Sequence, residues 1–143
     1  MAGNKEDWLR YEFFPAGHEL ITQGRQSGSL YVLKSGELEV SRDGSLLSSV
    51  SRPGAIFGEM SVLLEKPHSA TVRAVSDSEV IVIADALRVL ESHHGWTLQI
   101  ARLLAQRLST TTARLLASEG AGTEDERLVL PRNVFAQWGD PQV

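Results

Sequence analysis

Turn signals interrupt the first half of the sequence at short intervals, and this pattern constrains the fold more than any other feature. Residues 12–84 are rich in Gly, Ser and β-branched residues, and Gly recurs through them at a spacing typical of short strands joined by tight turns. Residues 29–50 show the pattern best, because apolar and polar residues alternate around a Lys-Ser-Gly turn and an Arg-Asp-Gly turn. So many short strands in one region predict a β-sandwich or barrel, which removes or protects strand edges.

The region after these strands is expected to be helical. Asp85 can cap a short helix that Gly95 would end, and Thr97 is the expected N-cap of a longer helix that ends near Ser118. Apolar residues recur along the longer helix at helical spacing. They are Ala101, Leu104, Ala105, Leu108 and Leu115. The leucines are expected to pack either against the strands or against a second copy of the helix.

These patterns divide the chain into one folded domain and a tail. The domain covers residues 1–118, with the strands over about 12–84 and the helices over about 85–118. Residues 119–143 are acidic and contain Gly and Pro, so they are expected to form a mobile tail or a segment that orders on a partner.

Composition excludes several classes of function. The chain of 143 residues contains no cysteine, so disulfides, iron–sulfur clusters and thiolate catalysis are excluded. Its net charge of −4 gives no indication of a nucleic-acid surface. There is no signal-peptide core and no apolar run of roughly 18 residues, so no membrane span is expected and a cytoplasmic location is the default. The four histidines show no metal-ligand or catalytic spacing, so no metal, no catalytic residue and no enzymatic activity are expected.

Residues 57–72, FGEMSVLLEKPHSATV, are the best candidate for a binding site. Gly58 has no Cβ, so backbone N–H groups of residues 58–62 could approach an anion closely. A carboxylate beside an anion is unfavourable unless it accepts hydrogen bonds from a hydroxyl group. Glu59 therefore fits a sugar phosphate, in which it would accept the ribose 2′-hydroxyl group, better than bare phosphate. The alternative is an ordinary turn in which Glu59 is solvated.

Residues 13–116 resemble the cyclic-nucleotide-binding domain family in the order and spacing of their motifs. The matching segments are FFPAGHELITQGRQSGSLYVLKSGELEV, then PGAIFGEMSVLLEKPHSATVRA, then the two C-terminal helices. The resemblance implies a mostly β fold with flanking helices: an eight-stranded, jelly-roll-like β-roll followed by a short helix and a long C-terminal helix. It also implies a ligand, cyclic AMP or cyclic GMP, with cyclic AMP favoured and no other cofactor.

The resemblance further implies which residues contact the ligand. They are Phe57, Gly58, Glu59, Met60, Ser61, His68, Ser69, Ala70, Thr111 and Thr112. Backbone groups of Gly58, Met60 and Ser61 would contact the ribose and the phosphate. Ser69 and Ala70 would face the phosphate from the strand that follows. Thr111 and Thr112 match the pair that reaches the purine in the long helix of the bacterial catabolite activator, but ordinary solvated positions would look the same.

His68 departs from the family pattern, which usually has Arg at this position. Guanidinium is always charged and pairs with phosphate oxygens in a bidentate manner, whereas imidazole with a pKa near 6.5 is mostly neutral at pH 7. Losing one charged hydrogen bond costs about 1.5–3 kcal/mol, or roughly 10- to 100-fold in affinity. If a bound anion keeps His68 charged, affinity should fall from about pH 6 to pH 8. The alternatives are a different ligand or none, or an anion held by another cation; Arg73 is expected to serve the fold instead.

The sequence thus predicts a non-enzymatic sensor that binds a cyclic nucleotide and reports it through the C-terminal helix. The alternative is a degenerate member of the fold that acts as a ligand-independent protein-interaction domain. Expected partners are the cyclic nucleotide, an unidentified protein effector and, through parallel pairing of the long helix, a second copy of the chain. Direct DNA binding is not expected, because only about 25 residues follow Ser118, and this acidic segment shows no second amphipathic helix pair.

Overall fold

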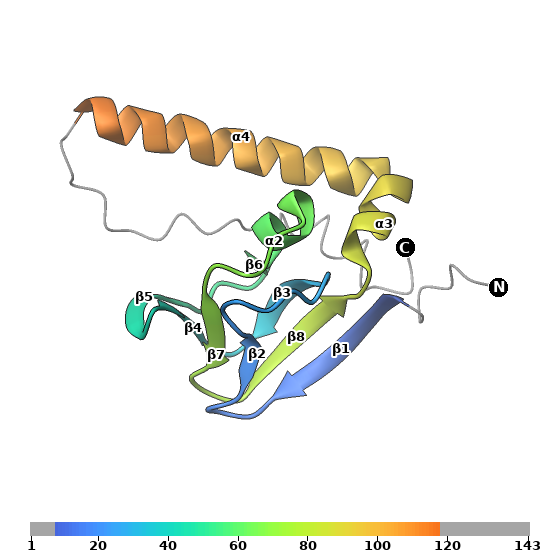
Figure 1. Ribbon diagram of the computed structural model, residues 1–143, viewed down its shortest axis with the longest axis vertical. Helices are drawn as coiled ribbons and strands as arrows, with labels where there is room; N and C mark the ends of the chain where they lie inside the picture. The colour runs from blue at the N-terminus through green and yellow to red at the C-terminus, as the bar shows by residue number, and fades with distance from the viewer. Residues whose placement is uncertain (1–7, 118–143) are drawn as a thin grey trace.

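The structure, a computed structural model, describes residues 8–117, in which eight strands form two four-stranded antiparallel sheets (Figure 1). One sheet has the strand order β1-β8-β3-β6 and the other β2-β7-β4-β5. The strands are β1 (Leu9–Phe14), β2 (Glu19–Ile21), β3 (Leu30–Ser35), β4 (Leu38–Arg42), β5 (Ser45–Val50), β6 (Ile56–Phe57), β7 (Thr71–Ala74) and β8 (Ser78–Ile83). Strands that are distant in sequence are neighbours in both sheets, as in a jelly-roll-like β-roll, and this confirms the predicted fold class.

Helices follow or interrupt the roll at three places within residues 8–117. α2 (Glu59–Leu64) lies between β6 and β7, and α3 (Ala86–Ser92) follows β8. α4 (His94–Ala117) has 24 residues and passes above α2 on the outside of the roll (Figure 1). The predicted short and long helices are therefore present, whereas the predicted tail over residues 119–143 lies outside the described part of the chain.

Alternation along β4 and β7 shows which side of their sheet faces the interior. Leu38 and Val40 of β4 are buried, and their partners across the ladder, Ala74 and Val72 of β7, are buried as well. Arg73, which lies between these two partners, is exposed. Since side chains alternate between the two faces of a strand, the even-numbered residues of β4 and β7 face the interior of the roll.

The prediction that Thr97 caps the long helix is wrong, because α4 begins three residues earlier, at His94. The hydroxyl group of Thr97 lies inside the helix and donates hydrogen bonds to the carbonyl oxygens of Leu90 and His93. Such back-bonding uses the same residue type as an N-cap, so sequence alone does not distinguish the two. Gly95, which was expected to end the short helix, lies in the first turn of α4, and only His93 separates the two helices.

Asp85 occupies the predicted N-cap position of α3 but does not cap it with its side chain. Its backbone is left-handed (φ 50°, ψ 50°), whereas an N-cap residue normally has an extended backbone. Its carboxylate instead lies 3.3 Å from the guanidinium group of Arg88. The strand region also begins earlier than predicted, at Leu9 instead of about residue 12, because β1 pairs with β8 along its whole length.

Three aromatic rings hold the start of α4 against the beginning of the roll. The His93 ring stacks on Trp96 with centroids 4.5 Å apart, and Trp8 meets Trp96 edge-on at 5.5 Å. Trp8 and Trp96 also pack against the apolar core beneath α3 and α4. Because Trp8 directly precedes β1, this cluster fixes the point from which α4 extends over the roll.

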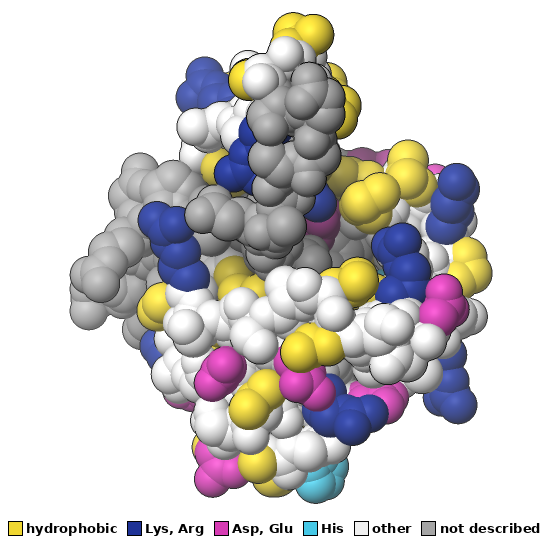
Figure 2. All heavy atoms as spheres, turned by 90° about the vertical axis from the view of Figure 1, so that its left-hand side faces the viewer, with side chains coloured by type: hydrophobic (Ala, Val, Ile, Leu, Met, Phe, Trp, Pro, Cys, Tyr) yellow, Lys and Arg dark blue, Asp and Glu magenta, His cyan; other side chains and the backbone are white. Residues whose placement is uncertain are grey.

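Only one side of α4 is covered by the roll. Ile100 is buried, and Leu103 and Leu104 pack against the same core cluster. Leu108 and Leu115 are 68% and 69% exposed, and Figure 2 shows hydrophobic side chains at the surface of this helix. Of the leucines expected to pack, Leu104 therefore contacts the roll, whereas Leu108 and Leu115 belong to a side that the roll leaves uncovered.

Gly36 permits the tight turn between β3 and β4, and replacing it with alanine should destabilise the roll. Its φ is +107°, and a Cβ there would lie 2.2 Å from Oγ of the fully buried Ser78. Backbone strain and overpacking each cost about 1–3 kcal/mol, so we expect Gly36→Ala to lower the free energy of unfolding by about 2–4 kcal/mol in urea denaturation. Gly95→Ala is the matched control, because a Cβ in that helical position meets nothing within 4 Å. Equal stability of the two variants would contradict this account.

Candidate ligand-binding site

The site is built around the junction of β6 and α2, where the backbone turns at Gly58. Gly58 is the N-cap residue of α2 and has φ 91° and ψ 1°, a left-handed conformation that favours glycine. A Cβ at this position would lie 2.9 Å from the carbonyl oxygen of Ser29, in the loop before β3. Both the conformation and the close approach therefore require Gly58, as the sequence motif indicated.

Glu59 is the one acidic residue of the first turn of α2, and it is buried, with 2% of its surface exposed. Its Oε2 lies 3.7 Å from Nη1 of Arg107, which projects from the middle of α4. Burying a carboxylate is costly unless it is paired or hydrogen-bonded, so the guanidinium group of Arg107 compensates part of that cost. This ion pair connects the predicted ribose-binding residue directly to the long helix.

The neighbouring predicted residues support the turn in different ways. Phe57 is completely buried in the core beneath the turn, so its side chain belongs to the interior of the fold. The hydroxyl group of Ser61 donates to the carbonyl oxygen of Lys66, whose amide donates back to the carbonyl oxygen of Ser61 at 3.1 Å. These bonds close the loop after α2. Met60, in contrast, has an exposed side chain, so it can offer a ligand its backbone and its flexible thioether.

His68 lies directly behind the turn, but its surroundings do not favour a charged ring. Its Cε1 would be 3.5 Å from a Cβ on Gly58, and the side chain is buried, with the residue 6% exposed. Its Nε2 lies 3.1 Å from Oγ of Ser27, which also accepts hydrogen bonds from the amide of Ser29 and the hydroxyl group of Tyr31. Because both lone pairs of Ser27 are used, its own proton points to Nε2, which therefore acts as an acceptor.

This network favours the neutral imidazole. Burial lowers the pKa of His68 below its ordinary value, because desolvation disfavours the charged form. The main chain of His68 is fixed as well: its amide donates to the carbonyl oxygen of Arg25 at 2.7 Å, and its carbonyl oxygen accepts from Gly24 at 2.9 Å. The network therefore favours a neutral His68 ring, and the expected charging of this ring by a bound anion stays a prediction.

Ser69 and Ala70 lie between His68 and β7, so they precede the strand on which the sequence placed them. Ala70 packs against the core cluster inside the roll. Ser69 is contacted by Arg42, the last residue of β4: Nε of Arg42 donates to the carbonyl oxygen of Ser69 at 3.0 Å and Nη2 donates to its Oγ at 3.3 Å. The sequence analysis did not identify Arg42. Its only signal was the alternation along the strand, in which Leu38, Val40 and Arg42 are every second residue and so share one face.

Thr111 and Thr112 are both exposed on the second half of α4, but they belong to different sides of the helix. Thr111 follows Arg107 by four residues, so it shares the side that contacts α2. Thr112 follows Leu108 by four residues and lies about 100° further around the helix, on the uncovered side. Thr111 therefore lies on the same side of α4 as Arg107 and Thr112 on the side of Leu108, and the contact of either threonine with a ligand stays a prediction.

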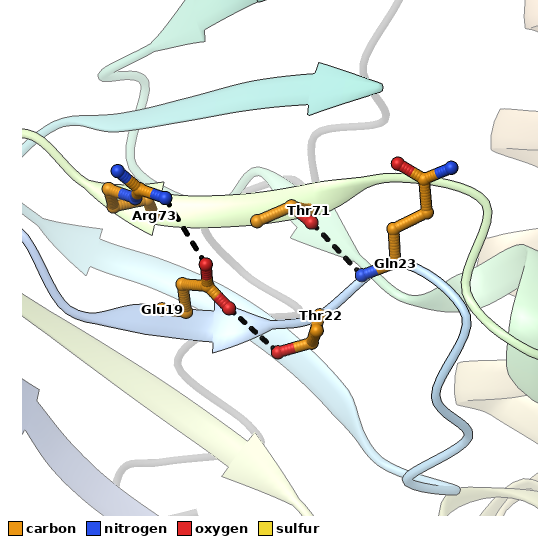
Figure 3. Close-up of polar contacts among 5 residues, drawn as sticks. All are labelled: Glu19, Thr22, Gln23, Thr71 and Arg73. Atoms are coloured by element: carbon orange, nitrogen blue, oxygen red, sulfur yellow. Dashed lines mark hydrogen bonds and ion pairs between the residues drawn. The ribbon is translucent and has the colours of Figure 1, made fainter. Parts of the chain in front are cut away.

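Arg73, considered as a substitute cation, is engaged on the outer face of the roll (Figure 3). Its Nη2 lies 3.2 Å from Oε2 of Glu19, and the other carboxylate oxygen of Glu19 accepts a hydrogen bond from Thr22 at 2.8 Å. The bond from Thr22, and to a lesser degree Arg73, lowers the pKa of Glu19. One residue further along, the amide of Gln23 donates to Oγ1 of Thr71. These contacts join β2 to β7, which supports the expected structural role of Arg73.

Two further findings bear on the kind of site. Within residues 8–117 no group of three or more His, Asp or Glu side chains is arranged to hold a metal ion. In the same part of the chain, no helix combines the length and the apolar character that crossing a membrane requires.

The buried His68 should make the stability of the protein sensitive to acid. A base whose pKa is lowered by folding stabilises the fold above its ordinary pKa of about 6.5, and this contribution is lost as pH falls through the folded value. We expect the free energy of unfolding to fall between pH 7 and pH 5, with this residue adding a slope of up to about 1.4 kcal/mol per pH unit. His68→Gln should flatten the slope in urea titrations, and His18→Gln, at an exposed position, should not. A slope that survives in His68→Gln would contradict the assignment.

Comparison with known proteins places this geometry in a family. The chain is 28% identical over 120 residues to the lysophospholipase nte1 of Neosartorya fischeri, covering 80% of this chain and 8% of that protein. It is 37% identical over 68 residues to the cGMP-dependent protein kinase egl-4 of Caenorhabditis elegans, covering 48% of this chain and 9% of the kinase. The crystal structure of the Thermus thermophilus catabolite activator protein superposes with a TM-score of 0.65 at 29% identity, covering 78% of this chain and 55% of that one.

The chain thus spans less than a tenth of the length of these two curated relatives, so the match concerns a domain and not their whole activities. The family profile described as the cyclic nucleotide-binding domain matches residues 11–92, which is more than half of the sequence. That match begins within β1 and extends to the end of α3, so it includes all of the turn that carries Gly58 and Glu59. The protein belongs to the cyclic nucleotide-binding domain family.

Proposed function

We propose that the chain is a non-enzymatic sensor that binds a purine cyclic nucleotide between α2, the segment before β7 and α4. The observation that carries the proposal is the buried Glu59 beside Gly58, in a position where it can accept the ribose 2′-hydroxyl group. Cyclic AMP is the favoured ligand, with cyclic GMP as its competitor, because a threonine hydroxyl such as that of Thr111 can donate to or accept from either purine.

The Glu59–Arg107 ion pair offers a way to report binding. A ribose hydroxyl group that donates to Glu59 shares the carboxylate with the guanidinium group of Arg107, which lies 3.7 Å away. Binding therefore changes the interaction that holds the middle of α4 to α2. The apolar contacts of α4 with the core come from Ile100 and its neighbours, so the part of the helix beyond them is the part expected to respond.

A second function has one observation in its favour. Where the family usually has Arg, this chain has a buried His68 that is hydrogen-bonded to Ser27 and has a lowered pKa. A roll without that phosphate partner could serve as a ligand-independent protein-interaction domain. Nucleotide titration separates the two functions.

The uncovered side of α4 supports pairing with a second copy of the chain. Its residues are spaced alternately three and four apart, the repeat of a coiled-coil seam. They are Leu98, Ala101, Ala105, Leu108, Thr112 and Leu115, and all are exposed. Such a stripe is complementary to itself, so two parallel helices related by a two-fold axis would bury it. The proposed sensor is accordingly a homodimer.

The proposed ligand site can be tested with the ribose hydroxyl group itself. We expect cyclic AMP to raise the melting temperature of the wild-type chain and to bind about 10- to 100-fold more tightly than its 2′-deoxy analogue, because Glu59 forms a charged hydrogen bond to the hydroxyl group. Glu59→Gln should remove most of that difference in calorimetric titrations. Glu65→Gln, an exposed change at the other end of α2, is the control and should keep it. If no cyclic nucleotide changes the melting temperature, the interaction-domain function replaces the sensor.

The proposed homodimer can be tested on the stripe alone. We expect the wild-type chain to sediment as a dimer and Leu108→Glu to sediment as a monomer, because a charge in the centre of the stripe would be buried without a partner. Leu64→Glu introduces the same charge at an exposed position of α2 and should remain dimeric. If the wild-type chain remains a monomer at protein concentrations of about several hundred micromolar, which is about 100 times the Kd of a micromolar dimer, the pairing is excluded.

A further inference from the structure

We propose that Arg42 supplies the positive charge that holds the phosphate of the ligand, in place of the residue at position 68. This inference rests on the proposed function and names a residue that the family motif around Gly58 does not include. One alternative raised by the sequence was that a cation other than His68 holds the anion, and Arg42 would be that cation.

Arg42 is the last residue of β4. Leu38 and Val40 point into the roll, and the alternation of the strand places Arg42 on the same inner face. The ladder pairs Ser41 with Thr71, so Arg42 lies beside Ala70, which itself packs against the interior cluster. Yet Arg42 is exposed, unlike the two inner residues that precede it. Its exposure follows from its position as the last residue of β4, directly before the turn to β5, so the guanidinium group lies at this end of the roll.

Arg42 also contacts Ser69 directly. Arg42 donates from Nε to the carbonyl oxygen of Ser69 and from Nη2 to its hydroxyl oxygen, at 3.0 and 3.3 Å. These bonds use two of the five N–H donors of the guanidinium group. They hold it beside the residue that the family resemblance places on the phosphate. A planar, permanently charged fork in this position matches the geometry of a phosphate group.

The adjoining acidic residue, Asp43, is bonded to Gln23 and not to Arg42. Asp43 is turned toward Gln23: Nε2 of Gln23 donates to Oδ1 of Asp43 at 2.8 Å, and the amide of Asp43 donates to Oε1 of Gln23 at 2.9 Å. This pair of hydrogen bonds also fixes the backbone directly after Arg42. The side chain thus extends from an anchored strand end, so less freedom is lost when it binds an anion.

Three other groups considered for this role are engaged in contacts of their own. Arg107 lies against the carboxylate of Glu59, and Arg73 pairs with Glu19 on the outer face of the sheet. The imidazole of His68 accepts a hydrogen bond from Ser27, and this favours its neutral form. Arg42 is the cation that combines an inner-face position with a direct contact to Ser69.

The test is a calorimetric titration of the full chain and its variants with cyclic AMP and cyclic GMP. We expect Arg42→Gln to bind both nucleotides about 10- to 100-fold more weakly, by the same factor for each, and to show a shallower dependence on salt concentration. Arg42→Lys keeps the charge but not the fork, so its loss should be smaller. Arg73→Gln removes an arginine of the same sheet from the outer face and should bind like the wild type.

The outcomes distinguish this inference from the proposed function. If the wild type binds and Arg42→Gln binds equally well, the inference is overturned and the proposed function stands. If Arg42→Gln alters the ratio of the two affinities, the guanidinium group contacts the base, and its assignment to the phosphate is overturned. If the wild type binds neither nucleotide, the proposed function fails and the inference fails with it. Should Arg42→Gln unfold, Arg42→Lys carries the test, because undiminished binding by that variant would exclude a bidentate contact.

Discussion

A carboxylate cannot be buried cheaply, and Glu59 is almost completely buried. The cost is of several kcal/mol for an isolated charge, so the fold must bring a positive or hydrogen-bonding group to it. Here the group is Arg107, which comes from a helix that begins 35 residues later in the sequence. The long helix, the turn at Gly58 and the proposed ribose contact therefore form one electrostatic unit. A ligand that engages Glu59 necessarily perturbs the contact of α4 with the roll, without any separate device for communication.

The same helix has a second task because its residues point in several directions. The side that carries Ile100 and Arg107 contacts the roll and α2, whereas the side that carries Leu108 and Leu115 is uncovered. Successive residues are 100° apart, so the adjacent threonines 111 and 112 fall on these two different sides. In the proposed homodimer, the position of this one helix would couple ligand occupancy to the geometry of pairing. That coupling would be a physical reason for a helix of 24 residues with so little of its surface buried in its own domain.

The sequence was sufficient where the determining interactions are local. Glycine turns and alternating strands predicted the roll because turn geometry and strand periodicity depend on neighbouring residues. The start of α4 was missed because Thr97 bonds backward to the carbonyl group of Leu90, which is seven residues earlier and in another helix. The resemblance placed His68 beside the turn, and it does lie close to Gly58. Its protonation could not be predicted, since it depends on Ser27 and Tyr31, which only the folded roll brings to it.

Arg42 and His68 illustrate why the location of a charge is a tertiary property. A motif records which residue types occur along one segment, but the phosphate responds only to the field at its own position. A guanidinium group that reaches Ser69 from β4 supplies the same attraction as one presented by the segment itself. The exchange also changes the character of the site: because an arginine remains charged at every physiological pH, its contribution to anion binding does not titrate, whereas that of a histidine does. If the charge lies on β4 as proposed, the buried imidazole can act as a hydrogen-bond acceptor for Ser27, which ties the segment before β7 to the loop before β3.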